Sequence, residues 1–459
     1  MKKLLIFLIA IPGLSLFMSC QKWVDVGSPG TQLSAEKIFQ SDATAISSVL
    51  AIYSQMETDG LNYNLIIHTG RSADELLNHS TSATNIELYT NNLTPGNSAV
   101  RNFWQVLYKY IYQANTLLEG LAMTPKVSEP VSRQLKGEAH FIRAFCYFYL
   151  VNLFGDAPLI LSTSYEDAAS RPRNNAGEVY SFIKEELTIA TALLSSDYLS
   201  GAHTPTAERV RPNRFAAHAL LARVHLYLSE WDRAEAEATI VLNNTNQYTL
   251  LSDPNEVFLK NSREAIWQWQ SQLPNRNTYA GAFLILTTRP SNISIDSNVV
   301  NSFSMDDLRK ANWIRSITSS GLHYYYPYKY KVRQNAPAIT EYTMVLRLSE
   351  QLLIRSEAIA MQDRTDEALA DLNAVRSRAG LSPLSGLSQS TLLDSIAQER
   401  RWELFTEFGD RWLNLKRTGT ATPVLSVVKG ANWADTDVLY PIPLSEIQLN
   451  SQLSQNAGY

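Results

Sequence analysis

Cysteine is scarce in this sequence of 459 residues, which contains only Cys20 and Cys146. Residues 1–19 have the composition of a secretory signal, and if Cys20 carries lipid, Cys146 is the only thiol left in the rest of the chain. A disulfide within the folded domain is then excluded. Cys146 stands among aromatic residues in a stretch with helical periodicity, so we expect a small buried apolar residue and not a nucleophile.

Long apolar runs are also lacking, apart from one at the start of the chain. This run extends from Leu4 to Met18, is 15 residues long and is interrupted by Pro12-Gly13. A membrane-spanning helix needs about 20 apolar residues to cross about 30 Å of hydrocarbon. The sequence therefore predicts no permanent transmembrane helix in this segment.

The same run has the flanks of a bacterial lipoprotein signal. Lys2 and Lys3 precede it and Ser19-Cys20 follows it, a pattern that resembles signals in which a peptidase cleaves before the cysteine and acyl chains are attached there. Two or three chains anchor a folded domain almost irreversibly, since each buried CH₂ contributes about 0.8 kcal/mol. We expect a signal peptide over residues 1–19 and lipidation of Cys20. The alternative is an ordinary cleaved signal with an unmodified Cys20.

Runs of basic residues, metal-binding spacings and nucleotide fingerprints are absent. The 40 Lys and Arg residues nearly balance the 44 Asp and Glu residues, so the sequence offers no basic patch for nucleic acid. His218 and His225 share a helical face without a third ligand nearby, and there is no H-E-x-x-H. G-x-S-x-G, P-loop and dinucleotide motifs are missing too. We expect no metal, no cofactor and no nucleic-acid partner.

One set of carboxylates has to be weighed against a glycoside hydrolase. Glu399, Glu403 and Glu407 are spaced at i, i+4 and i+8 on one face of a predicted helix. A glycosidase needs two carboxylates about 5–10 Å apart across the scissile bond, normally from different elements. An exposed stripe interleaved with arginines predicts ion pairing instead, with Glu407 and Arg411 in the favourable i, i+4 order. We expect no catalytic residue here.

Helical periodicity dominates most of the remaining chain. Residues 20–34 contain Gly and Pro without a hydrophobic period, which indicates a flexible tether after the lipidated cysteine. A helix is expected to start at Ser34 and to end at Asp59-Gly60. Further helices are expected over residues 103–117, 135–149 and 178–194.

Two later stretches repeat one another as helix pairs. Ala222 is followed twelve residues later by Ala234, and Ser356 is followed twelve residues later by Ala368. Small residues at these positions let paired helices approach closely, and the spacing is that of a tetratricopeptide unit. A stack of such units buries one continuous core in a long chain. Ordinary antiparallel helix pairs are the alternative.

Two loop-rich segments interrupt the helical pattern. Residues 60–98 are rich in Asn, Thr and Ser, and residues 245–341 alternate short β-like runs with Asn, Ser, Pro and Gly. The β-like runs are Ala265–Gln270 and Phe283–Thr287. Segments of this length exceed what packing requires, and long loops usually carry function. Trp267 and Trp269 alternate with glutamines, and we expect both in the core.

The most aromatic part of the sequence lies in the second loop-rich segment. From Tyr324 to Tyr330, five tyrosines and a proline occupy seven positions. Alternate side chains of a strand face opposite ways, so some of these rings must lie at a surface, where they can stack on sugars and donate hydrogen bonds. The alternative is a strand whose aromatics cover the helical stack. The candidate ligand-binding residues are Trp313, Tyr324, Tyr325, Tyr326 and Tyr328, with Arg71 and Asp74 from the first segment.

Motifs along the whole chain then form a known pattern. The most specific one runs from Gln134 to Leu159 and contains Gly-Glu-Ala, Arg-Ala-Phe and Phe-Gly-Asp-Ala-Pro-Leu. Further motifs follow at residues 214–228, 345–350 with 372–380, 399–404 with 409–412, and 439–447 with 455–459. Their sequence and order resemble the SusD/RagB family of outer-membrane nutrient-binding lipoproteins of Bacteroidota.

The resemblance implies a fold. It is mainly α, a right-handed stack of tetratricopeptide-like helix pairs, with a loop-rich irregular face that carries a few short strands. Residues 35–459 would form one such domain, with insertions at about 60–98 and 245–341. The shared motifs are scaffold residues, so Glu138 with Arg143, and Glu399 with the arginines that follow it, are expected to tie helices together.

The resemblance also implies a function. Family members are surface-exposed lipoproteins of the cell outer membrane that bind glycan and deliver it to a SusC-like TonB-dependent transporter. Capture of peptide or another nutrient by the same lid mechanism is the alternative. In the family the ligand face comes from the variable loops, which here are the two loop-rich segments.

Overall fold

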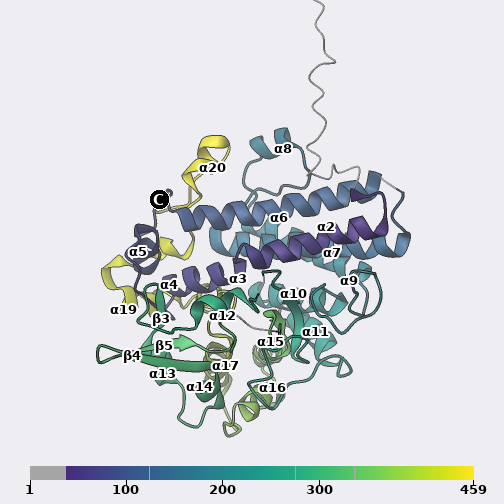
Figure 1. Ribbon diagram of the computed structural model, residues 1–459. Helices are drawn as coiled ribbons and strands as arrows, with labels where there is room; N and C mark the ends of the chain where they lie inside the picture. Colours follow the sequence, from purple (N-terminus) through teal and green to yellow (C-terminus); the bar gives the residue numbers. More distant parts are fainter. Residues whose placement is uncertain (1–37, 124, 274, 335–337) are drawn as a thin grey trace, which may run out of the picture.

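The computed structural model describes residues 38–123, 125–273, 275–334 and 338–459. Cys20, the signal peptide and the tether lie outside these residues. Long helices cross one side of the molecule, and a small sheet projects from the other (Figure 1). The predicted mainly α-helical fold with a few short strands is confirmed.

The first described helix, α2 (Asp42–Thr58), has a polar cap at its start. The Ser41 hydroxyl accepts a hydrogen bond from the Thr44 amide at 3.3 Å, which satisfies one of the free amides of the first turn. The expected helix start at Ser34 lies outside the described residues, and the helix that ends at Thr58 begins at Asp42. Its predicted end at Asp59-Gly60 is confirmed, because Gly60 adopts a left-handed conformation with φ 66°.

The centre of the core is α7 (Glu129–Phe154), most of whose side chains are buried. It lies between α6 (Ser98–Met123) and α9 (Ala176–Leu193). Cys146 is fully buried there, and burial raises the pKa of its thiol, as expected for an apolar core residue.

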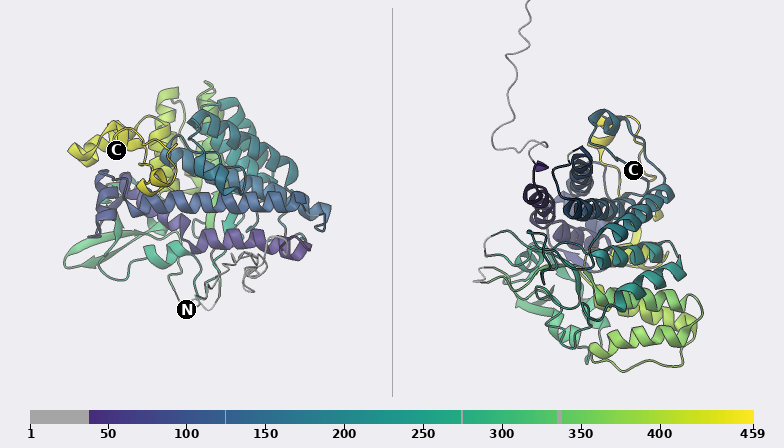
Figure 2. Two further views of the ribbon diagram at one scale, coloured as in Figure 1. Left: turned by 90° about the horizontal axis from the view of Figure 1, so that it is seen from above. Right: turned by 90° about the vertical axis from the view of Figure 1, so that its right-hand side faces the viewer.

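Helix pairs then stack one after another along the chain. The stack comprises α9, α10 (Arg214–Tyr227), α11 (Trp231–Leu242), α15 (Leu348–Ala360), α16 (Thr365–Arg378) and α17 (Gln389–Leu404). The layers are visible in the right-hand view of Figure 2. Ala222 and Ala234 share one buried cluster, and the Ser356 hydroxyl donates to the Ala368 carbonyl at 2.8 Å. The small residues of the repeat therefore lie where the two helices of each pair meet.

Two antiparallel sheets complete the framework. The larger has the order β1 (Leu76–Asn78), β3 (Ile293–Ile295), β5 (Leu322–Pro327), β4 (Ile314–Ser319). The smaller pairs β2 (Ala265–Trp269) with β6 (Thr343–Arg347). Trp267 and Trp269 in β2 have no exposed surface, and their rings meet at 5.4 Å, which confirms their predicted core position.

The remaining elements are short. They are α3 (Leu61–Asn64), a π-helical turn η2 (Leu65–Thr69), α4 (Gly70–Ser72), α5 (Ala83–Thr90), α8 (Tyr165–Ser170), α12 (Tyr279–Leu284), α13 (Ser297–Ser302), α14 (Leu308–Trp313), α18 (Asp410–Arg417), α19 (Ala421–Lys429), the 3₁₀ turns η3 (Gly430–Asn432) and η4 (Asp435–Val438), and α20 (Leu444–Leu449). None of the helices in the described residues is long and apolar enough to cross a membrane.

Two local expectations are wrong. Residues 60–98, expected to be mainly loop, contain four short helical elements and strand β1. The apolar run Phe283–Thr287, expected to be β-like, begins inside α12 and continues without strand pairing. The Thr278 hydroxyl accepts from the Gly281 amide at 2.9 Å and starts this helix, a capping signal that outweighs the apolar run.

Candidate ligand-binding face

The two loop-rich segments, far apart in sequence, meet in space. Strands β1 and β3 pair them directly, with Leu76 opposite Ile295. Asn292 adds a second joint, because its side-chain amide donates to the Tyr63 hydroxyl at 2.9 Å and its side-chain oxygen accepts from Arg71. The two loop-rich segments therefore form one face of the molecule.

An aromatic cluster lies on this face, formed by Tyr63, Tyr279, Phe283 and Arg276. The three rings are in mutual contact, with centroids 4.6 to 5.6 Å apart. The guanidinium carbon of Arg276 lies 5.2 Å from the centre of the Tyr279 ring and 5.1 Å from that of Phe283. Phe283 is 44% exposed, so this cluster presents a ring to solvent.

A cavity of about 150 Å³ adjoins the exposed ring. It is lined by Phe283, the residues from Ile285 to Ile293, and Arg333. Thr287, Thr288 and Ser291 contribute exposed positions with hydroxyl groups. Ring faces beside hydroxyls and an arginine suit a ligand that is flat, partly apolar and rich in hydrogen-bonding groups.

The tyrosines of β5 lie on both faces of the larger sheet, as strand alternation requires. Tyr325 packs against the hydrophobic core on one face. Tyr324 and Tyr326 are on the other face but are only 8% and 9% exposed. The Tyr324 ring is covered edge-on by His79 at 5.5 Å. Neither side of the strand offers an open tyrosine platform.

Tyr328 is half-buried, and two cations lie over its ring. Arg315 lies 5.2 Å and Lys331 lies 4.5 Å from the centre of its ring, and the Tyr326 ring meets it edge-on at 6.1 Å. The residue, which follows the end of β5, keeps some exposure.

Trp313 is a core residue, which corrects its expected role as a stacking platform. It has no exposed surface, and its indole N–H donates to the Pro254 carbonyl at 2.9 Å. Phe258 packs edge-on at 5.5 Å, and the Lys329 ammonium lies 4.9 Å from the ring centre. The ring is therefore covered by the protein itself and has no face left for a ligand.

Arg71 also has a structural role in place of the expected ligand contact. Arg71 is fully buried, and its guanidinium donates to the side-chain oxygens of Asn78 and Asn85 at 3.0 Å each, as well as to that of Asn292. Burial lowers the pKa of its guanidinium to about 10. Arg71 thus holds the two loop-rich segments together from inside.

Asp74 is likewise occupied by the protein itself. Its carboxylate accepts from Arg411 at 2.7 and 2.8 Å and from Arg401 at 2.8 Å. Burial alone raises its pKa, but the bonds and charge of Arg411 outweigh burial and hold the pKa below its ordinary value. Asp74 ties the first loop-rich segment to the C-terminal helices.

The carboxylates considered for hydrolysis are buried, not exposed as expected. Glu399 and Glu403 have no exposed surface, and one Arg309 nitrogen lies 2.7 Å from Glu399 and 3.0 Å from Glu403. Burial raises the pKa of Glu403, but the charges of Arg378 and Arg347 hold it well below its usual range. Ion pairing, the predicted role, is confirmed for both glutamates.

The expected Glu407–Arg411 pair does not form. Glu407 lies beyond the end of α17 and accepts from Arg347 at 2.8 Å on both carboxylate oxygens. Arg411 instead binds Asp74. The i, i+4 rule fails here because the helix stops before Glu407.

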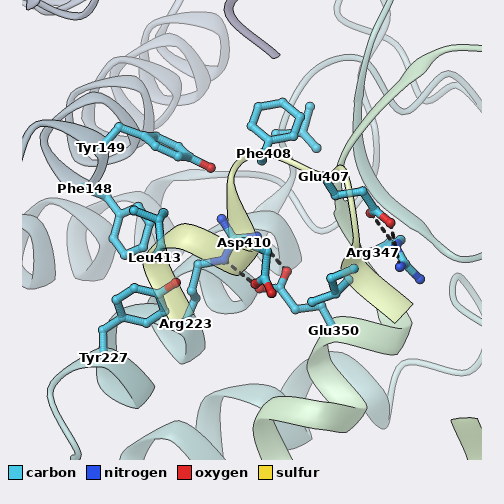
Figure 3. Close-up of a pocket in the computed structure, with 12 residues that line it drawn as sticks. Phe148, Tyr149, Arg223, Tyr227, Arg347, Glu350, Glu407, Phe408, Asp410 and Leu413 are labelled. Carbon is cyan, nitrogen blue, oxygen red and sulfur yellow. Dashed lines mark hydrogen bonds and ion pairs between the residues drawn. The ribbon is translucent and has the colours of Figure 1, made fainter. Parts of the chain in front are cut away.

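An enclosed cavity in the scaffold is too small for a ligand. It has a volume of about 20 Å³, enough for about one water molecule. Arg223 lines it and donates to both oxygens of Glu350 at 2.7 and 2.6 Å (Figure 3). Asp410, another lining residue, accepts from Arg400. Each of these charges has a partner, so the cavity belongs to the helix scaffold.

The sequence therefore indicated the two segments that meet at this candidate face, but not the aromatic cluster found on it. The sequence indicated the two loop-rich segments, but not Tyr63, Tyr279 or Phe283. Phe283 stood in a run with β-like composition, and Tyr63 and Tyr279 are single tyrosines with no neighbouring aromatic residue. The spacing between them arises only when α3 contacts α12.

Comparison with known proteins agrees with this architecture. The family model described as "Starch-binding associating with outer membrane" matches residues 22–226, and the one described as "SusD family" matches residues 298–459. SusD-like protein P2 of Formosa agariphila is 27% identical over 492 residues, covering 93% of this chain and 94% of the relative.

Solved structures show the same fold. A SusD homolog from Bacteroides thetaiotaomicron matches with a TM-score of 0.79 at 20% identity, covering 93% of this chain and 98% of that chain. A laminarin-binding SusD-like protein matches with a TM-score of 0.75 at 24% identity, covering 90% and 99%. With two family models along the chain and a relative of nearly equal length, this protein belongs to the SusD/RagB family.

Proposed function

We propose that this protein is an outer-membrane lipoprotein that binds glycan on its loop-rich face and delivers it to a TonB-dependent transporter. Membership of a family described as starch-binding and associated with the outer membrane supports this function. The observation that carries it is the aromatic cluster, since an exposed phenylalanine supported by two tyrosines beside a polar cavity has the chemistry for stacking on sugar rings.

Binding occurs without turnover in this proposal. The carboxylates that resembled a hydrolase site are buried in ion pairs and cannot reach a glycosidic bond. What the loop-rich face offers instead is aromatic rings, hydroxyls and arginines, which hold a ligand and do not activate water.

Lipidation of Cys20 anchors the domain, and the face is presented to the exterior. A SusC-like transporter is the partner that would receive the ligand. The proposed order of events is capture on the loop-rich face followed by transfer into the transporter, with the helical stack as a rigid support.

Among the tyrosines indicated by the sequence, Tyr325 in β5 and Tyr328 just after it keep partial exposure and remain proposed contributors. Two cations already lie over the Tyr328 ring, so we place it second to the aromatic cluster.

A glycan array probed with the full-length protein in detergent tests the function. Binding to a restricted set of oligosaccharides, without release of shorter products, is the expected result. Cleavage of a bound oligosaccharide would overturn binding without turnover. A response only to peptides would favour the alternative, nutrient capture by the same face.

A further inference from the structure

A second concave surface lies on the helical side of the molecule, away from the loop-rich face. It is a groove of about 410 Å³ between α6, α8 and α20. In Figure 1, α8 and α20 rise above α6 at the top, whereas the aromatic cluster belongs to α3 and α12 below it. The volume falls within the range of small-molecule sites, roughly 300–1,000 Å³. We call this surface the α6 groove.

Three aromatic residues of α6 form its base. Trp104, Tyr108 and Tyr112 are spaced at i, i+4 and i+8, so they lie on one helix face. The Trp104 and Tyr108 rings meet at 4.9 Å, and the Tyr108 hydroxyl donates to the Pro158 carbonyl at 2.8 Å, which fixes the ring. The base of the groove is thus rigid and aromatic before any ligand binds.

Two of the tyrosines that line the groove are exposed, one on α6 and one on α8. Tyr112 is 54% exposed and Tyr165, on α8, is 80% exposed. Exposing large rings forgoes the stabilisation that their burial would give, so two of them at one groove are unexpected for packing alone. Tyrosine keeps a ring face and a hydroxyl available to a ligand.

The polar groups at the groove select the ligand class. The Gln105 amide donates to the Glu446 carboxylate at 3.1 Å and so links α6 to α20 across the groove. Among the described residues that line it there is no Lys, Arg or His. Glu446 is the one charged residue among the described residues that line the groove, which disfavours anionic ligands. Amide, carboxylate and phenol groups beside aromatic rings favour a neutral polyhydroxylated ligand.

We infer that the α6 groove is a second carbohydrate-binding site, which takes a neutral oligosaccharide segment between Tyr112 and Tyr165. The inference extends the proposed function to a second location. A long glycan held at two places on one chain dissociates more slowly than one held at a single place, because the second contact becomes intramolecular.

Single substitutions on exposed side chains test the groove without threatening the fold. The variants are Tyr112→Ala and Tyr165→Ala in the full-length protein, with Met123→Ala as control, because Met123 is 83% exposed and lies at the end of α6 outside the groove. The probes are neutral hexasaccharides that give a signal with wild-type protein on an array. Isothermal titration measures affinity and stoichiometry for each variant, alone and combined with Phe283→Ala.

We expect some oligosaccharide binding to remain in the Phe283→Ala variant, at the α6 groove. Adding Tyr112→Ala or Tyr165→Ala should weaken this remaining affinity about tenfold or more, whereas adding Met123→Ala should leave it unchanged. Equal affinity in all three groove and control variants would overturn the inference and leave the proposed function intact. Altered co-purification of an envelope protein with unchanged sugar affinity would also overturn it, by identifying the groove as a protein interface.

If wild-type protein binds no neutral oligosaccharide but Phe283-dependent binding of another glycan persists, the inference alone fails. If no glycan binds at all, both fail.

Discussion

Arg143 and Glu186 form a two-point ion pair that joins α7 to α9. The Nε and Nη2 atoms of Arg143 each lie 2.7 Å from a different oxygen of the Glu186 carboxylate. The pair is buried, and Asn115 on α6 accepts a third bond from the same guanidinium at 3.1 Å. One arginine from the family motif therefore ties three helices together, as its motif position predicted.

Breaking this pair is expected to destabilise the stack. Glu186→Gln leaves Arg143 buried opposite a neutral group, and loss of one partner of a buried pair costs about 3–5 kcal/mol. The melting temperature, measured by circular dichroism, should fall clearly. Glu235→Gln is the matched control, because Glu235 also pairs with an arginine but both side chains are partly exposed, and solvent-exposed pairs contribute only about 0–1 kcal/mol. Equal melting temperatures in the two variants would contradict the structural role.

Substitutions of Trp313 and Phe283 should have different effects, one mainly on the stability of the fold and the other mainly on glycan affinity. Trp313→Ala removes a fully buried ring, and such changes cost about 3–5 kcal/mol. Phe283→Ala removes a ring that is 44% exposed, so its effect on stability should be smaller while its effect on glycan affinity is larger. Thermal unfolding and titration of the same two proteins provide the comparison. A stable Trp313→Ala protein with reduced affinity would show that the tryptophan contacts ligand after all.

Glu57 is expected to make stability depend on pH. Burial raises the pKa of its carboxyl from 4.5 to about 7, because the charged form is poorly solvated there. The unfolded chain loses this proton near pH 4.5, whereas the folded chain keeps it to about pH 7. The folded state therefore binds this proton more tightly than the unfolded chain does. The free energy of unfolding is highest below pH 4.5 and falls by roughly 3 kcal/mol as the pH rises to 7.

The substitution Glu57→Gln isolates this effect from other titrating groups. Its carbonyl can still accept from the Tyr279 amide, which bonds to Glu57 at 2.9 Å in the wild type. The difference in melting temperature between variant and wild type should grow in favour of the variant from pH 4.5 to pH 7. A difference that stays constant with pH would show that Glu57 titrates normally.

The proposed anchor predicts a change of location without a change of fold. Cys20→Ala removes the acylated side chain, so the protein should leave the membrane fraction while its circular dichroism spectrum is preserved. Cys146→Ala is the matched control, because that thiol is buried in α7 and takes no part in anchoring. Membrane fractionation at high salt measures both. A Cys20→Ala protein that stays in the membrane fraction would exclude lipidation as the anchor.

The sequence allowed the helical framework to be predicted because its signals are local. Ala222 with Ala234 and Ser356 with Ala368 are small at fixed spacing, and the helices that they indicate contact one another in the structure. Residue spacing within one or two helices is enough for such a prediction.

The candidate site depended on contacts that sequence spacing does not reveal. Arg71 bonds to Asn292 and Asp74 bonds to Arg401, partners more than two hundred residues away, and these contacts turned apparent ligand residues into internal ties. Trp313 has the same ring chemistry in a core as on a surface. The packing of Phe258 and Lys329 around the ring makes it a core residue and not a surface platform for a ligand.

Quantitative titration of an array-selected oligosaccharide into wild-type protein and the Phe283→Ala variant tests the central claim most directly. Val427→Ala is the control, because Val427 is 83% exposed and lies on α19, outside the aromatic cluster. Loss of one stacked ring costs on the order of 1–3 kcal/mol, so Phe283→Ala should weaken binding by about 5- to 150-fold while Val427→Ala binds as wild type. Equal affinity in all three proteins would contradict a glycan site on the loop-rich face.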